Sequence, residues 1–236
     1  MSEWRMKRFW TEAAPVETAS GWGIALDGRP VRTPAKDLLE LPSRALAEAA
    51  ADEWNAQEEV VDPGAMPVTR AGNSAIDKVR PQFDEVARLT ADYGGTDLLC
   101  YRAEQPAELV RRQTAGWDPL LDWAAADLGA RLLPVAGVMF QPQDARALDR
   151  LHREVRALDP WRLTAFSDLV ALSGSLVIGF AVAREALDPD EAWRRSRIDE
   201  TWQAEQWGED EEAAEAAEIK RLVFLDAARF LRLAGS

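Results

Sequence analysis

The longest apolar stretch of the chain covers residues 165–186. Its apolar side chains occupy nearly the whole circumference of a helical projection, so a helix formed here must be enclosed by other elements. Its uncharged part, residues 169–183, is shorter than the ~20 apolar residues that span a bilayer. Its small residues would let neighbouring helices approach closely. The sequence therefore predicts one central helix over residues 165–186 within a helical domain.

The first 40 residues or so follow a different pattern, with a period of two. Trp22, Ile24 and Leu26 alternate with small residues, and Asp27-Gly28 comes next. Asp-Gly after such a run is typical of a two-residue β-hairpin turn. A few short strands bury little surface by themselves. We therefore expect a small antiparallel β unit that depends on other elements for its stability.

The rest of the chain shows the period of amphipathic helices. In residues 144–158, for example, Leu148, Leu151, Val155 and Leu158 form one apolar stripe. The fold class expected is α+β, with a β-rich domain of residues 1–65 that contains one helix and an α-helical domain of residues 66–236. Residues 60–67 are expected to form a loop. Helices are expected over residues 42–57, 81–93, 106–113, 118–128, 144–158, 165–186 and 189–208.

Charge and cysteine content restrict the partners. The net charge of -13 argues against non-specific binding to nucleic acid or to an anionic membrane. The single cysteine, Cys100, rules out an internal disulfide and fits a reducing compartment. No apolar segment typical of a signal peptide follows the basic residues near the start. We therefore expect a cytoplasmic protein whose partner is another protein.

The residue sets of familiar catalytic sites are missing from the sequence. His152, the only histidine, is predicted to lie on the charged flank of an amphipathic helix. Neither G-x-x-x-x-G-K-[ST] nor G-x-G-x-x-G occurs. Asp199 and Glu200 are adjacent and point to different helix faces, so they cannot act on one bond as a pair. We expect no catalytic residue, no metal and no cofactor, which favours a binding protein over an enzyme.

A helix over residues 189–208 would carry an unusual surface. In projection, Trp193 and Trp207 share a narrow stripe with Glu200 between them, while Arg197 and Gln203 lie on its flanks. Burying an unpaired carboxylate costs on the order of several kcal/mol. Either Glu200 forms a salt bridge with a nearby arginine, or the stripe is an exposed contact patch with aromatic anchors.

Acidic residues dominate the segment that follows. Between positions 205 and 218 the chain has seven carboxylates and no Lys or Arg. Such a run is usually a solvated helix face. The alternative is an acidic surface that steers a basic partner during association.

Several segments together resemble the ATP synthase assembly chaperones that act on the alpha subunit of the catalytic head. They follow the family's order along almost the entire chain. They are LDGRPVRTP (26–34), EWNAQ (53–57), MPVT (66–69), TDLLCYRA (96–103), Gln113 with WDPL (117–120), GSL (174–176), SRIDETWQ (196–203) and QWG (206–208).

The resemblance implies an N-terminal β domain, a C-terminal helical domain and a bacterial member of the family. It also implies an ATP-independent chaperone that binds the unassembled alpha subunit and prevents its aggregation until beta arrives. Glu200 is similar to the functional glutamate of the family, with Gln203 and Trp207 beside it. Asp199 and Thr201 stand where the family often has glutamates. We expect this chaperone to be a monomer.

A second hypothesis is enzymatic. Glu200 in a tryptophan-lined pocket could act as an acid of raised pKa in a carboxylate-based hydrolase. That reaction requires a second carboxylate across a cleft within roughly 10 Å. An open Glu200 surface would instead favour the chaperone.

Overall fold

The computed structural model describes residues 7–137 and 139–235. The chain divides into two compact units. The first contains the chain up to Phe83, the segment Pro160–Ala165 and the residues from Arg229 onward; the second contains Asp84–Asp159 and Phe166–Ala228. The predicted boundary after residue 65 differs from this division, because the helical residues 67–82 also belong to the first unit. No helix in these described ranges has both the length and the apolarity needed to cross a membrane.

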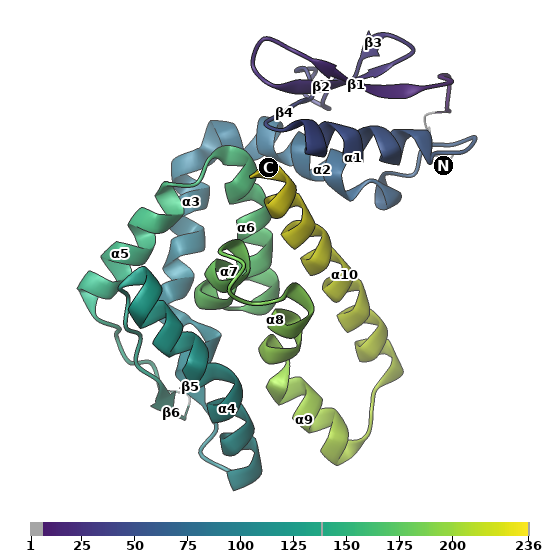
Figure 1. Ribbon diagram of the computed structural model, residues 1–236. Coiled ribbons are helices and arrows are strands. Elements are labelled where there is room, and N and C mark those ends of the chain that lie inside the picture. Colours follow the sequence, from purple (N-terminus) through teal and green to yellow (C-terminus); the bar gives the residue numbers. More distant parts are fainter. Residues whose placement is uncertain (1–6, 138, 236) are drawn as a thin grey trace. The chain divides into compact units, whose positions relative to one another are not determined.

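The first unit contains the antiparallel sheet that the sequence predicts (Figure 1). Its strands are β1 (Ala13–Glu17), β2 (Trp22–Leu26), β3 (Arg29–Pro30) and β4 (Glu40–Leu41). Their order is β1-β2-β3, and β4 also pairs with β2. Asp27 and Gly28 connect β2 to β3 with φ values of 46° and 81°, the positive values that a type I′ turn requires. The predicted hairpin and the α+β fold class are confirmed.

Helix α1 (Arg44–Asn55) packs against β1 and β2. Its start follows from Ser43, whose hydroxyl oxygen accepts a hydrogen bond from the Leu46 amide. Leu46, Ala50 and Trp54 are buried, as their spacing of four predicts. Helix α2 (Pro67–Ser74) follows, continued by a π-helical turn over Ala75–Val79 and a 3-10 turn over Arg80–Gln82. Helix α2 is not among the predicted helices, because proline is common in loops as well as at the first position of a helix.

A buried carboxylate connects α1 to the start of α2. Glu53 accepts hydrogen bonds from the Val68 amide at 2.7 Å and from the Thr69 amide and hydroxyl at 2.8 Å each. Burial raises the pKa of Glu53, while these hydrogen bonds act in the opposite direction. The motif segments 53–57 and 66–69 therefore meet in the fold through the side chain of Glu53.

The helical elements continue with α3 (Phe83–Asp92), α4 (Ala107–Trp123), α5 (Ala145–Arg156), α6 (Pro160–Ser173) and α7 (Leu176–Ala183). They are followed by α8 (Pro189–Ser196), α9 (Ile198–Trp207) and α10 (Glu211–Ala234). Short turns of 3-10 helix cover Pro63–Ala65, Tyr93–Thr96 and Leu98–Cys100, and a π-helical turn covers Ala124–Leu128. Strands β5 (Tyr101–Arg102) and β6 (Val135–Ala136) form a parallel pair.

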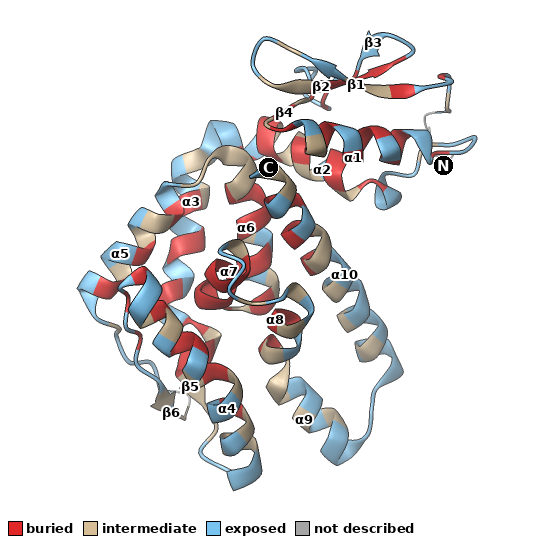
Figure 2. Ribbon diagram, viewed as in Figure 1, coloured by how far each residue is buried: buried red, intermediate tan, exposed pale blue. Residues whose placement is uncertain are grey.

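Two predictions about helix boundaries are wrong. The apolar stretch forms two helices, because Gly174 adopts φ 73° after α6 and Ser175 caps α7 by accepting from the Ile178 amide. Helix α7 is nevertheless enclosed, as its composition requires: every residue from Leu176 to Val182 is buried (Figure 2). Conversely, residues 106–113 and 118–128 do not form separate helices, since α4 continues through Pro119.

Asp97 fixes the start of α7 to the turn before β5. Its two carboxylate oxygens accept hydrogen bonds from the amides of Leu99 and Val177, each at 3.0 Å. The Leu98 amide donates in addition to the Gly174 carbonyl at 3.0 Å. Complete burial raises the pKa of Asp97 to about 6. The motif segments 96–103 and 174–176 are therefore also joined by a buried carboxylate.

Candidate functional site

The segment expected to carry the site is two helices and not one. Helix α8 ends at Ser196, and Arg197 leaves helical geometry with φ -113° and ψ 20° before α9 begins. The Arg197 guanidinium stabilises this break, donating to the Leu172 carbonyl at 3.1 Å and to the Ser196 hydroxyl at 3.2 Å. The prediction of one helix over residues 189–208 is wrong, because the break at Arg197 depends on contacts with residues distant in the sequence.

Trp193 is consequently separated from the other predicted site residues. Its side chain is buried, and its ring lies 5.6 Å from that of Phe224 on α10. The Arg197 guanidinium covers it at 4.9 Å from the ring centroid. Trp193 therefore belongs to the core that supports α8, and it does not share an exposed stripe with Trp207.

Three predicted residues remain together on the outside of α9. Glu200, Gln203 and Trp207, here called the α9 surface, are all exposed and follow each other at helical spacing. Trp207 is 79% exposed. Glu200 pairs with Arg197 at 2.9 Å, and its side chain remains 57% exposed. The predicted salt bridge therefore forms, and the carboxylate still faces solvent. The interpretation of this surface as a contact patch stays a prediction.

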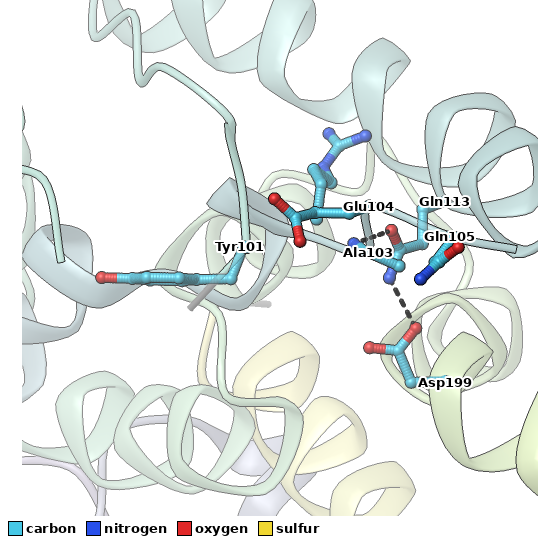
Figure 3. Close-up of a pocket in the computed structure, with 8 residues that line it drawn as sticks. Tyr101, Ala103, Glu104, Gln105, Gln113 and Asp199 are labelled. Atoms are coloured by element: carbon cyan, nitrogen blue, oxygen red, sulfur yellow. Dashed lines mark hydrogen bonds between the residues drawn. The ribbon is translucent and has the colours of Figure 1, made fainter. Parts of the chain in front are cut away.

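Asp199 points away from this surface. Its carboxylate accepts a hydrogen bond at 2.7 Å from the side-chain amide of Gln113, which is itself buried (Figure 3). The Gln113 side-chain oxygen in turn accepts from the Ala103 amide at 2.8 Å. These bonds link α9 to α4 and to the segment after β5. Asp199 therefore holds α9 in place, whereas the neighbouring Glu200 faces outward.

Asp199 also borders a pocket of about 370 Å³. Glu200 does not line it, so the pocket offers no enclosure for the acid that the hydrolase hypothesis needs. Cys100 is buried, and desolvation raises the pKa of its thiol to about 12, which keeps it unreactive. No cluster of three or more metal-binding side chains occurs in the described part of the chain. The residues lining the pocket are Tyr101, Arg102, Ala103, Glu104, Gln105, Gln113, Gly137 and Asp199.

Helix α4 positions both α8 and α9. The Trp117 indole is fully buried and donates to the Arg195 carbonyl, near the end of α8, at 2.8 Å. Arg112 pairs with Glu205 of α9 at 2.7 Å and stacks on the Trp202 ring at 4.8 Å. Sequence reasoning did not find the Arg112–Trp202 contact. No local signal could have shown it, because the two residues meet only through the fold.

The sequence model of the ATP12 chaperone protein family matches residues 7–125. The chain belongs to this family. The family predicted from the sequence motifs is therefore confirmed. The matched range includes Glu53, Asp97, Gln113 and Trp117, the buried residues that fasten helices in the fold.

The α9 surface lies beyond the range that the family model matches. Solved structures of relatives are similar to nearly the whole of this ATP12-family chain, the α9 surface included. The crystal structure of Atp12 from Paracoccus denitrificans is 52% identical, with a TM-score of 0.96 over 98% of this chain and 100% of that one. The structure of an aspartate-to-lysine mutant of P. denitrificans Atp12p has the same identity and TM-score, over 99% of this chain and 100% of that one. The mitochondrial protein atp12 of Schizosaccharomyces pombe is 26% identical, over 89% of this chain and 76% of the relative.

Proposed function

We propose that this ATP12-family chain is an ATP-independent assembly chaperone. Its client is the unassembled alpha subunit of the ATP synthase catalytic head, which it keeps from aggregating before pairing with beta. Membership of the ATP12 chaperone family supports the chaperone role. The proposed client follows from the resemblance of the sequence motifs. The chain acts by binding and performs no catalysis.

The main support for the proposed binding site is the exposure of Trp207 on the same side of α9 as Glu200. An indole that is 79% exposed leaves a large apolar area in contact with water. Tryptophan is among the residues most enriched at the energetic centres of protein interfaces. Glu200 and Gln203 supply a charge and a hydrogen-bonding amide at its edge. We therefore place the contact with alpha on the α9 surface, with Arg197 orienting Glu200; Trp193 supports α8 from the core.

Reversing the charge of Glu200 is expected to remove chaperone activity. In Glu200→Lys the new ammonium would lie beside Arg197 and present the wrong charge to the client. An exposed ion pair contributes about 1 kcal/mol or less to stability, so the variant should remain folded. The measurement is the amount of soluble alpha subunit recovered when each variant is co-expressed with it, which should fall to the level without chaperone.

Glu48→Lys is the matched control. Glu48 is 50% exposed and pairs with Arg44 one helical turn away, but it lies on α1. This variant should rescue alpha as well as the wild type does. Full rescue by a folded Glu200→Lys would exclude Glu200 from the site. If the wild-type chain itself failed to increase soluble alpha, the proposed client would be wrong.

A further inference from the structure

The middle of α10 has an apolar face that none of the residues in the described ranges covers. Ile219, Leu222 and Val223 are 58%, 50% and 37% exposed. Their spacing of three and four residues places them on one side of the helix. Phe224 and Ala228, on the other side, are buried. The three exposed residues are here called the α10 stripe, and the surrounding helix surface is mostly exposed (Figure 2).

Helix formation does not require these residues. All eight positions from 211 to 218 are alanine or glutamate, which stabilise a helix without packing against anything. Ile and Val are weaker helix formers, because their branched side chains lose rotamer freedom in a helix. Water also favours polar side chains at exposed positions. The stripe is therefore better explained by contact with another molecule than by the folding of α10.

Carboxylates continue the same face toward the start of the helix. Glu215 and Glu212 precede Ile219 by four and seven residues, so they align with the stripe. Both are exposed. Among the described residues neither forms an ion pair. Glu218, by contrast, is paired with Arg221 at 2.8 Å. The surface is therefore apolar at one end and negatively charged at the other. It is complementary to a polypeptide segment whose apolar residues are followed by basic ones.

We propose that the α10 stripe is a second contact surface for the client, separate from the α9 surface. It binds an apolar segment of the alpha subunit whose lysine or arginine side chains lie against Glu212 and Glu215. This inference rests on the proposed function for the identity of the client. The carboxylates accelerate association with the basic segment, and burial of the stripe slows dissociation.

The test replaces the stripe with polar residues that retain the helix, in the triple variant Ile219→Gln, Leu222→Gln and Val223→Gln. Glutamine is a good helix former, so the melting temperature should not fall. The dissociation constant for purified alpha subunit should rise at least tenfold. Leu89→Gln is the matched control, because Leu89 is also 50% exposed but lies on α3. This control should bind alpha as the wild type does.

The charged part of the stripe is tested separately. The double variant Glu212→Gln and Glu215→Gln should lower the association rate with alpha severalfold at low salt. It should also weaken the dependence of that rate on ionic strength, because fewer charges steer the encounter. An association rate equal to that of the wild type at low salt would overturn the role of these carboxylates.

The outcomes separate this inference from the proposed function. If Glu200→Lys weakens binding while the triple glutamine variant binds as the wild type does, the α10 stripe is not a contact and the proposed function stands. If the wild-type chain does not bind alpha, the proposed function itself fails. If sedimentation shows a dimer that the triple variant dissociates, the stripe binds a second copy of this chain and the inference is overturned.

Discussion

Replacing Trp117 with alanine is expected to lower the free energy of unfolding by about 3–5 kcal/mol, the usual cost of removing a large buried aromatic side chain. Trp117 is fully buried, and the Arg102 guanidinium lies 5.2 Å from its ring centroid. The substitution would leave a cavity and remove the hydrogen bond to the Arg195 carbonyl. Urea unfolding followed by circular dichroism measures the loss.

The variant Trp117→Phe separates the two contributions. It retains most of the ring volume but cannot donate to the Arg195 carbonyl, so we expect a smaller loss of about 1–3 kcal/mol. Because that carbonyl lies just before the break at Arg197, this variant should also weaken client binding without unfolding the protein. Stability of Trp117→Ala equal to the wild type would show that Trp117 does not support α8.

Replacing Asp97 with alanine is expected to cost about 2–4 kcal/mol, because the buried amides of Leu99 and Val177 would lose their acceptors. The segment before β5 would then be less firmly attached to the start of α7. Thermal or urea unfolding at pH 7 measures the effect. A loss below about 0.5 kcal/mol, the range of ordinary surface substitutions, would contradict this role for Asp97.

The same residue makes stability depend on pH. Its pKa in the folded protein is about 6, above the reference value of 3.8. Between these two values the folded state binds more protons than the unfolded state, so the contribution of Asp97 to stability rises as the pH falls through 6. From pH 7 to pH 5 we expect a gain of about 1 kcal/mol relative to Asp97→Asn, which cannot titrate. A constant difference between the two proteins would contradict the raised pKa.

Local signals in the sequence predicted much of the fold. The Asp27-Gly28 turn and the apolar side of α1 depend on short-range geometry, and both agree with the structure. Of the stripe predicted for residues 144–158, Leu151 and Val155 are buried, whereas Leu158 lies beyond the end of α5. The failures occur where distant contacts decide the conformation. The break at Arg197 is stabilised by the carbonyl of Leu172, and no residue near Arg197 in the sequence reveals that contact.

The geometry of the candidate site could also be predicted only where it depends on local spacing. Spacing along α9 predicted that Glu200, Gln203 and Trp207 lie on one side of a helix, because that geometry needs only one regular helix. Their role in binding stays a prediction. Spacing misplaced Trp193, since the projection was extended across a helix boundary. The different surroundings of Asp199 and Glu200 were also beyond the sequence, because the partner of Asp199 is on α4.

Amide hydrogen exchange of the chain, with and without saturating alpha subunit, tests the central claim most directly. If the α9 surface binds the client, the amides of residues 198–207 should exchange more slowly in the complex, while those of α1 should not change. Unchanged exchange over residues 198–207 in a fully formed complex would contradict the assignment of the client contact to α9.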